Sequence, residues 1–208
     1  MTRPTSYSIL STAIILGLLT FTPAAAQDAS APLALAAARV SIAGTSNIHE
    51  FTASTTDVKV TRLVLADGIA GAGMLNAALN PGSLAAFEIV VKAGTLSSPK
   101  EGLDKNMWKA LKTTQHPNIV FTLTRLEGKP GALRATGMLQ IAGVEKEVAF
   151  DLKAAANAST ITVIGEVPLL MTDFGIAPPK AMLGMLKTDP KITVTFEVVL
   201  GAPATFTR

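Results

Sequence analysis

"KITVTFEVVL", residues 191–200, decides the class of fold because apolar and polar residues alternate along it. Successive side chains of a β-strand point to opposite faces, so Ile192, Val194 and Phe196 share one face and Thr193 lies on the other. Such alternation is typical of an antiparallel sheet with one face in the core and the other in water. The sequence therefore predicts an all-β fold that contains this strand.

The same alternation recurs along much of the chain and indicates about eight strands. Segments rich in turn residues, at 127–131, 142–145 and 156–159, join strands at hairpin spacing. Since helical segments do not alternate with the strands, a parallel α/β sheet is disfavoured. Besides 191–200, the expected strands cover residues 39–44, 50–65 with a bend, 72–79, 86–94, 119–123, 148–152 and 161–167.

Antiparallel strands joined by hairpins form a sandwich or a barrel, and the residues expected to face inward favour a barrel with an open apolar lumen. Several of these residues are small, and only 5% of the chain is aromatic, which leaves little bulk to fill a barrel. A filled core is the alternative. The small inward residues are Ala72, Ala93, Ala135, Gly137 and Gly165.

The stretch 102–112 changes from the period of a strand to that of a helix. Its apolar residues fall on one face and its lysines on the opposite face, with Trp108 near the edge of the lysines. We expect this helix to cover one end of the barrel with its apolar face inward. The lysines form a solvated face, or alternatively attract an anionic headgroup or membrane surface. The apolar residues are Leu103, Met107 and Ala110, and the basic residues are Lys105, Lys109 and Lys112.

A second cover is expected from residues 169–183, where Met171, Phe174 and Met182 are close to Met185. Flexible thioether side chains adapt to irregular apolar partners, as a lipid requires. Ordinary core packing beneath a long loop is the alternative.

The N-terminus has the parts of a secretory signal peptide. Arg3 supplies a positive charge, residues 9–21 an apolar run, and Ala24 and Ala26 a small-residue cleavage site before Gln27. The apolar run is shorter than the roughly 20 residues that span a bilayer. The sequence contains no cysteine, which excludes disulfides and a thioether-linked lipid. The sequence therefore predicts an exported, soluble protein.

Few residues could carry chemistry. His49 precedes Glu50, but adjacent strand residues point to opposite faces, so Glu50 is badly placed to orient His49. The sequence has neither a cysteine nor a Gly-x-Ser-x-Gly motif to supply a nucleophile, and His49 and His116 are too few histidines for a typical metal site. We expect His49 to form a hydrogen-bonded turn with Ser46 and Asn47 at the barrel rim, where a contact with the ligand end stays open.

Four stretches stand out when they are taken in order: "GTSNIHEF" (44–51), "LDKNMWKALKTTQHPNIVF" (103–121), "GMLQIAGVEKEVAF" (137–150) and "DFGIAPPKAMLG" (173–184). Together they resemble the YceI-like family of exported bacterial proteins described as polyisoprenoid-binding. The resemblance extends over about residues 39 to 200. It implies an all-β, eight-stranded antiparallel lipocalin-like barrel that holds a long-chain lipid in an elongated cavity, with no catalytic residues.

We therefore expect a signal peptide (1–26), a flexible leader (27–38), a lipid-binding barrel (39–201) and a C-terminal tail (202–208). The expected function is non-catalytic binding, storage or transport of a long-chain lipid in the periplasm. The ligand is of the polyisoprenoid or isoprenoid quinone class, and no other cofactor is expected. The net charge of +3, without a run of basic residues, argues against a nucleic-acid partner. A transient membrane contact and a dimer both stay open.

The residues expected to contact the lipid come from the apolar faces of the strands and from the two covers. They are Phe87, Ile89, Met107, Trp108, Ile119, Phe121, Leu123, Phe150, Val163, Phe174, Met182 and Phe196, with His49 at the rim. Two rival functions remain: a periplasmic enzyme acting on a prenyl or acyl lipid through His49, and a structural barrel without a ligand.

The position of the cleavage site gives a first prediction. The exported protein should begin at Gln27 and carry no lipid anchor, because a small-residue site precedes this polar residue. N-terminal sequencing of the periplasmic protein measures this directly. Recovery of the full-length chain in the membrane fraction would contradict it.

Overall fold

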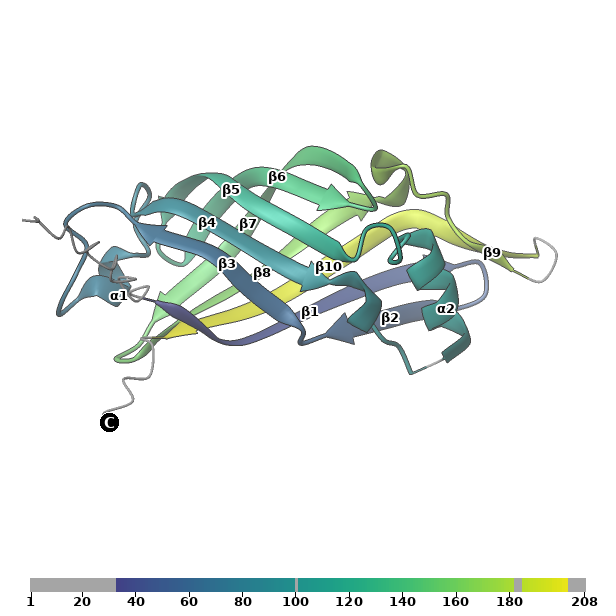
Figure 1. Ribbon diagram of the computed structural model, residues 1–208, viewed down its shortest axis with the longest axis horizontal. Coiled ribbons are helices and arrows are strands. Elements are labelled where there is room, and N and C mark those ends of the chain that lie inside the picture. The colour runs from purple at the N-terminus through teal and green to yellow at the C-terminus, as the bar shows by residue number, and fades with distance from the viewer. Residues whose placement is uncertain (1–32, 100, 182–184, 202–208) are drawn as a thin grey trace, which may run out of the picture.

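The computed structural model describes residues 33–99, 101–181 and 185–201, which form an elongated, strongly curled antiparallel sheet (Figure 1). The predicted signal peptide, the first half of the leader (27–32), Met182 and the C-terminal tail lie outside the described residues. The strands are β1 (Ala34–Ser46), β2 (Glu50–Thr55), β3 (Val58–Leu65), β4 (Leu84–Lys92), β5 (Asn118–Lys129), β6 (Ala132–Ile141), β7 (Val144–Ala156), β8 (Thr160–Leu170), β9 (Lys180–Ala181) and β10 (Leu186–Gly201).

Two α-helices and two short 3₁₀ segments accompany the strands in the described residues. Figure 1 shows α1 at one end of the barrel and α2 near the other. The helices are α1 (Met74–Ala77) and α2 (Glu101–Ala110), and the 3₁₀ segments are η1 (Ala93–Thr95) and η2 (Met171–Phe174).

A single bent segment joins the two margins of the sheet. The strand order is β2-β1-β10-β8-β7-β6-β5-β4-β3, so its first and last strands are consecutive in the chain. Only Thr56 and Asp57 separate β2, which pairs with β1, from β3, which pairs with β4. The predictions of a bend within 50–65 and of an antiparallel barrel are therefore confirmed.

The number and bounds of the strands differ from the prediction. The structure has ten strands in the described residues instead of eight: 50–65 divides at its bend, β6 and the short β9 were not among the expected strands, and the strand expected at 72–79 is absent. The predicted strand at 72–79 is wrong. Gly71 and Gly73 have positive φ values of 72° and 88°, which interrupt an extended chain, and α1 follows them. Ala72, which was expected to face inward, is exposed.

The first strand also begins earlier than expected. β1 starts at Ala34 rather than Arg39, and Leu33 is only 2% exposed. The last part of the predicted flexible leader is therefore wrong, since residues 34–38 belong to the sheet. Local composition concealed this strand because its alanine-rich sequence alternates weakly.

The turns that join β5 to β6, β6 to β7 and β7 to β8 lie within the three predicted segments. In the turn between β6 and β7, Ala142 and Gly143 both have positive φ values, of 51° and 84°, as a tight hairpin requires. The His116 ring packs directly over Gly143, where the Cβ atom of any other residue would approach the ring's Cε1 atom to 2.5 Å. Only glycine therefore satisfies both the turn and the contact with His116.

Two of the small inward residues do not leave empty space, although the sequence suggested that they would. The ring of Phe121 covers Gly137, and the ring of Phe196 covers Gly165, so that a Cβ at either glycine would collide with the ring. Phe196 and Gly165 are directly paired across β10 and β8. These glycines leave room for the two phenyl rings against the inner wall.

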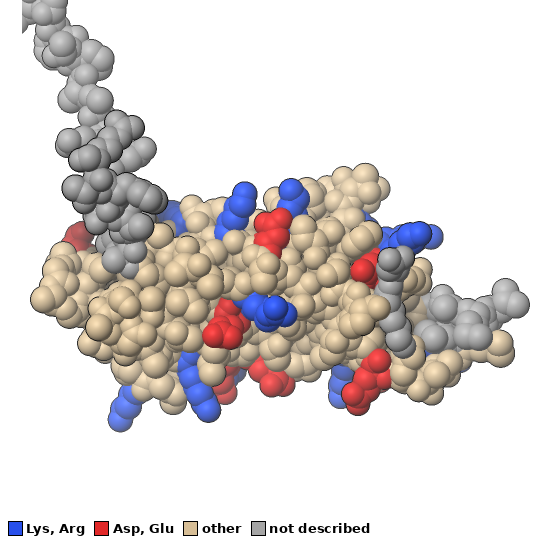
Figure 2. All heavy atoms as spheres, turned by 90° about the horizontal axis from the view of Figure 1, so that it is seen from below, with Lys and Arg blue, Asp and Glu red and all other residues tan. Residues whose placement is uncertain are grey.

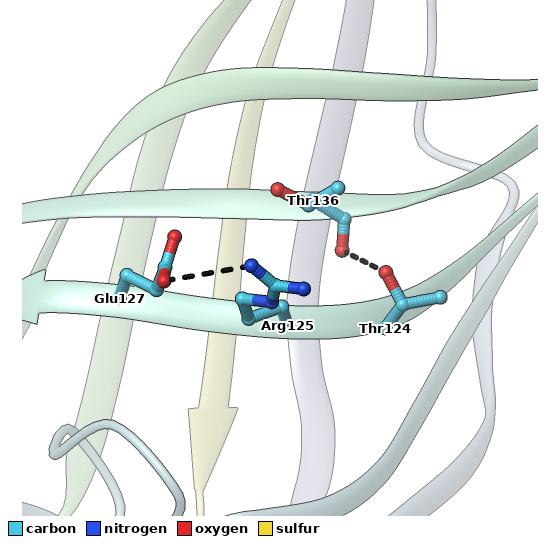
Figure 3. A network of polar contacts seen from close by, with 4 residues as sticks. All are labelled: Thr124, Arg125, Glu127 and Thr136. Carbon is cyan, nitrogen blue, oxygen red and sulfur yellow. Dashed lines mark hydrogen bonds and ion pairs between the residues drawn. The ribbon is translucent and has the colours of Figure 1, made fainter.

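A bulge in β5 changes which residues face inward. The register with β6 shifts between Leu123 and Arg125, and the hydroxyl of the intervening Thr124 donates to the Thr136 carbonyl at 3.0 Å. Figure 3 shows this bond beside the exposed Arg125–Glu127 ion pair, 3.7 Å long. Strict alternation would turn Arg125 inward after Leu123. The extra residue turns it outward.

The close packing at Gly137 generates a stability prediction. Gly137→Ala should lower the free energy of unfolding by about 1–3 kcal/mol, because the added methyl group meets the Phe121 ring and the Thr122 carbonyl. Urea denaturation provides the measurement. Gly102→Ala is the matched control: nothing lies within 4 Å of its Cβ position in α2, so stability should stay equal or rise slightly. Equal effects of the two substitutions would contradict the role of packing at Gly137.

Candidate ligand-binding site

The barrel encloses an apolar cavity with a volume of about 280 Å³. Its walls come from β1, β2, β4 to β8 and β10, together with α2 and η2. Among the described residues that line it, Thr188 has the only polar side chain. The volume is near the lower end of known ligand pockets, ~300 Å³. Because the lining residues extend from one end of the barrel to the other, this cavity suits a thin, elongated molecule.

The end of the cavity near α1 is closed by buried apolar side chains. Leu33 precedes β1, Leu79 follows α1, and Leu200 lies near the end of β10; all three line the cavity and are buried. The buried Ser83 hydroxyl donates to the Ala78 carbonyl at 2.6 Å and fixes the segment after α1. The sequence did not reveal this closure, because Leu33 lies in a low-complexity stretch and Leu79 was assigned to a strand.

The helix α2 covers the cavity near its other end, as the sequence predicted. Met107, Ala110 and the following Leu111 line the cavity. Lys105 and Lys109 are exposed on the opposite face of the helix, as is Lys112 just beyond it. The buried Asp104 carboxylate accepts the Ser98 backbone N–H at 2.8 Å, which anchors the helix to the segment that precedes it.

Trp108 does not lie on the cavity wall, contrary to its prediction as a ligand contact. Its indole Nε1–H donates to the Leu96 carbonyl at 2.8 Å. Leu96 itself is buried and lines the cavity. Trp108 therefore holds a lining residue in place, and a helical period alone could not reveal this bond to a segment outside the helix.

The second predicted cover is formed in part. Met171, Phe174 and Ile176 are buried and line the cavity, and Lys146 of β7 pairs with Asp173 of η2 at 3.3 Å. Met185 does not belong to this cover, because it is exposed next to β10.

Three phenyl rings meet in the interior of the barrel. The ring centroids of Phe121 and Phe150 are 5.4 Å apart, and those of Phe150 and Phe196 are 5.6 Å apart. The second pair meets edge to face, a favourable arrangement for aromatic rings. Phe196 packs against both apolar clusters of the core, one toward each end of the barrel. A ligand that extended through the whole cavity would have to pass these rings.

Most of the residues predicted to contact a lipid share the cavity wall. The exceptions are Trp108, and Met182, which lies outside the described residues. Those on the wall are Phe87, Ile89, Met107, Ile119, Phe121, Leu123, Phe150, Val163, Phe174 and Phe196.

His49 lies in an exposed turn and not on the cavity wall. Its backbone N–H donates to the Ser46 hydroxyl at 3.1 Å, that hydroxyl donates to the His49 carbonyl at 2.8 Å, and it is 3.3 Å from His49 Nδ1. This is the hydrogen-bonded turn that the sequence predicted. Ser46 pairs with Thr188, the polar residue of the cavity lining.

On the face in Figure 2, basic and acidic side chains are interspersed. Within the described ranges, no three His, Asp or Glu residues gather as a metal site. No helix in this part of the chain is long and apolar enough to cross a membrane.

Comparison with known proteins agrees with this geometry. Residues 34–200 match the YceI-like domain. No curated protein matches the chain. The fold is similar to that of BcnA from Burkholderia cenocepacia, with a TM-score of 0.62 and 12% identity over 78% of this chain and 95% of that one.

A second similar structure is a polyisoprenoid-binding domain from Saccharophagus degradans implicated in plant cell wall breakdown. Its TM-score is 0.61, with 15% identity over 83% of this chain and 99% of that one. At such identities the likeness of both structures concerns the fold alone. The domain match, which covers the whole barrel from β1 to β10, shows that this chain belongs to the YceI-like family.

Proposed function

We propose that this protein binds a long-chain lipid in the barrel cavity and stores or transports it without catalysis. The observation that carries this proposal is the elongated cavity whose described lining is apolar except for Thr188. An apolar chain that leaves water for such a site gains about 25 cal/mol per Å² of buried surface. A chain of many carbons therefore binds without any directional contact.

The lining also restricts the chemistry of the ligand. None of the described lining residues carries a charge, and burying an isolated charge there would be costly. The part of the ligand inside the cavity is therefore uncharged, and any ionised headgroup stays outside. An isoprenoid or the tail of an isoprenoid quinone meets this requirement. The polyisoprenoid-binding domain of similar fold supports this class of ligand.

The arrangement of His49 favours binding over catalysis. Its side chain is exposed, its ring lies beside the Ser46 hydroxyl, and neither residue lines the cavity. The part of a lipid that lies inside the cavity would be apart from this imidazole. We further propose that the protein works in the periplasm, on the basis of the signal peptide expected at residues 1–26.

The central phenyl rings provide the direct test. Phe121→Arg should abolish lipid loading, because it places a charge where the apolar chain should lie. Thr122→Arg is the control: Thr122 faces the outside, where its hydroxyl donates to Glu88 at 3.4 Å, and binding should be retained. The measurement is added polyprenol bound per folded protein, with folding checked by circular dichroism. Full loading of a folded Phe121→Arg variant would refute the proposal.

A second test concerns the rival enzymatic function. His49→Ala should change lipid affinity by less than about tenfold, or 1.4 kcal/mol, because His49 does not line the cavity. Titration with the same polyprenol measures the affinity. Complete loss of binding in a folded variant would make His49 a primary ligand contact. A turnover of a prenyl or acyl lipid that disappears with His49 would establish the enzyme instead.

A further inference from the structure

The two most exposed large apolar side chains of the described residues lie at the same end of the barrel. Ile48, in the turn between β1 and β2, is 60% exposed, and Met185, just before β10, is 66% exposed. Val64 and Ile164 are less exposed, at 44% and 45%, and lie within strands of the wall. Single apolar residues on a surface are ordinary, but a pair on neighbouring segments at one end of the barrel suggests a partner.

Asn47 fastens the two loops to each other. Its backbone N–H donates to the Lys187 carbonyl at 3.1 Å, and its side-chain Nδ2 donates to the Met185 carbonyl at 2.8 Å. The Lys187 backbone N–H in turn donates to Asn47 Oδ1 at 2.9 Å. These bonds hold the backbone beside Ile48 and at Met185 in one arrangement. We call Ile48 and Met185 together the apolar tip.

The apolar tip adjoins the end of the cavity where the lining reaches solvent. Thr188 lines the cavity and pairs with Ser46. Ile48 lies two residues after Ser46, and Met185 lies three residues before Thr188, so both residues of the tip are close to this pair. Leu170, at the end of β8 beside η2, also lines the cavity and is 38% exposed. By contrast, buried leucines close the opposite end near α1.

The charged residues near the apolar tip have both signs, so they do not favour a strongly charged partner. Lys187 and Lys191 are exposed there, but so are Glu50 and Asp189. Apolar contact must therefore supply most of any attraction. A lipid bilayer fits these features better than a charged protein surface, because its boundary accepts apolar side chains. At this position it would also lie next to the end from which a lipid would leave the cavity.

We propose that the apolar tip inserts into a lipid bilayer surface and places the open end of the cavity against the lipids. The role of this contact in lipid exchange rests on the proposed function, whereas the contact itself can be tested separately. Two side chains that insert partly into the bilayer, Ile48 and Met185, give a weak and reversible attachment. Exchange of the lipid between membrane and solution requires such reversibility.

The absence of cysteine from the sequence allows site-specific labelling. Ile48→Cys, Met185→Cys and, as a matched control, Ile164→Cys are each labelled with a polarity-sensitive fluorophore. The labelled proteins are mixed with phosphatidylcholine vesicles, with or without phosphatidylglycerol. We expect emission from positions 48 and 185 to shift to the blue with vesicles and emission from 164 to stay unchanged. No shift at the tip, or an equal shift at 164, would overturn the proposal.

Vesicle co-sedimentation provides the second measurement. The double variant Ile48→Ser, Met185→Ser should bind at least about tenfold more weakly, whereas Ile164→Ser should bind as the unaltered protein does. Loading with polyprenol delivered from cyclodextrin should be normal in all three. If polyprenol binds but the double variant co-sediments with vesicles as the unaltered protein does, the apolar tip is not the docking surface. If the tip behaves as expected but no polyprenol binds, the docking surface stands and the proposed function fails.

Discussion

The cavity exists because one bent segment pairs with both margins of the sheet. Residues 50–65 pair with β1 through β2 and with β4 through β3, so the two margins of a long sheet are brought together. Without this connection, the apolar inner faces of the strands would lie open to water. The bend is stabilised by Thr55, whose buried hydroxyl contacts the Thr95 hydroxyl at 2.7 Å and accepts the Asp57 backbone N–H at 3.0 Å.

The buried polar side chains lie at the bend and in the segments that cover the two ends of the barrel. Among the described residues, the buried polar or charged ones are Thr55 at the bend, Ser83 after α1 and Asp104 in α2. Each has a hydrogen bond, and no buried side-chain polar atom in these residues lacks a partner. Since an unpaired buried polar group costs stability, this arrangement reserves the interior for apolar contacts. The cavity can therefore remain both apolar and dry.

The wall combines large rings with glycines, and this combination gives the cavity its narrow form. The ring of Phe121 lies against Gly137, and the ring of Phe196 lies against Gly165. Each ring fills the space that a larger side chain at the glycine would occupy. Beside the start of β10, the polar side chain of Asn47 joins two loops that expose apolar side chains. Side-chain packing thus determines the shape of the cavity, whereas the hydrogen bonds of Asn47 hold together the segments that carry the apolar tip.

Local periodicity and turn chemistry were enough to predict the all-β class, the hairpin turns, the bend in 50–65 and the covering helix. They also identified wall residues such as Phe121, Phe150 and Phe196. The folded chain was needed to show that residues 72–79 leave the sheet, that Leu33 and Leu96 line the cavity, and that Trp108 does not. The positions of Leu33, Leu96 and Trp108 depend on contacts with other segments of the chain, about which local alternation carries no information. At 72–79 the cause is local, because Gly71 and Gly73 adopt positive φ values that interrupt the strand.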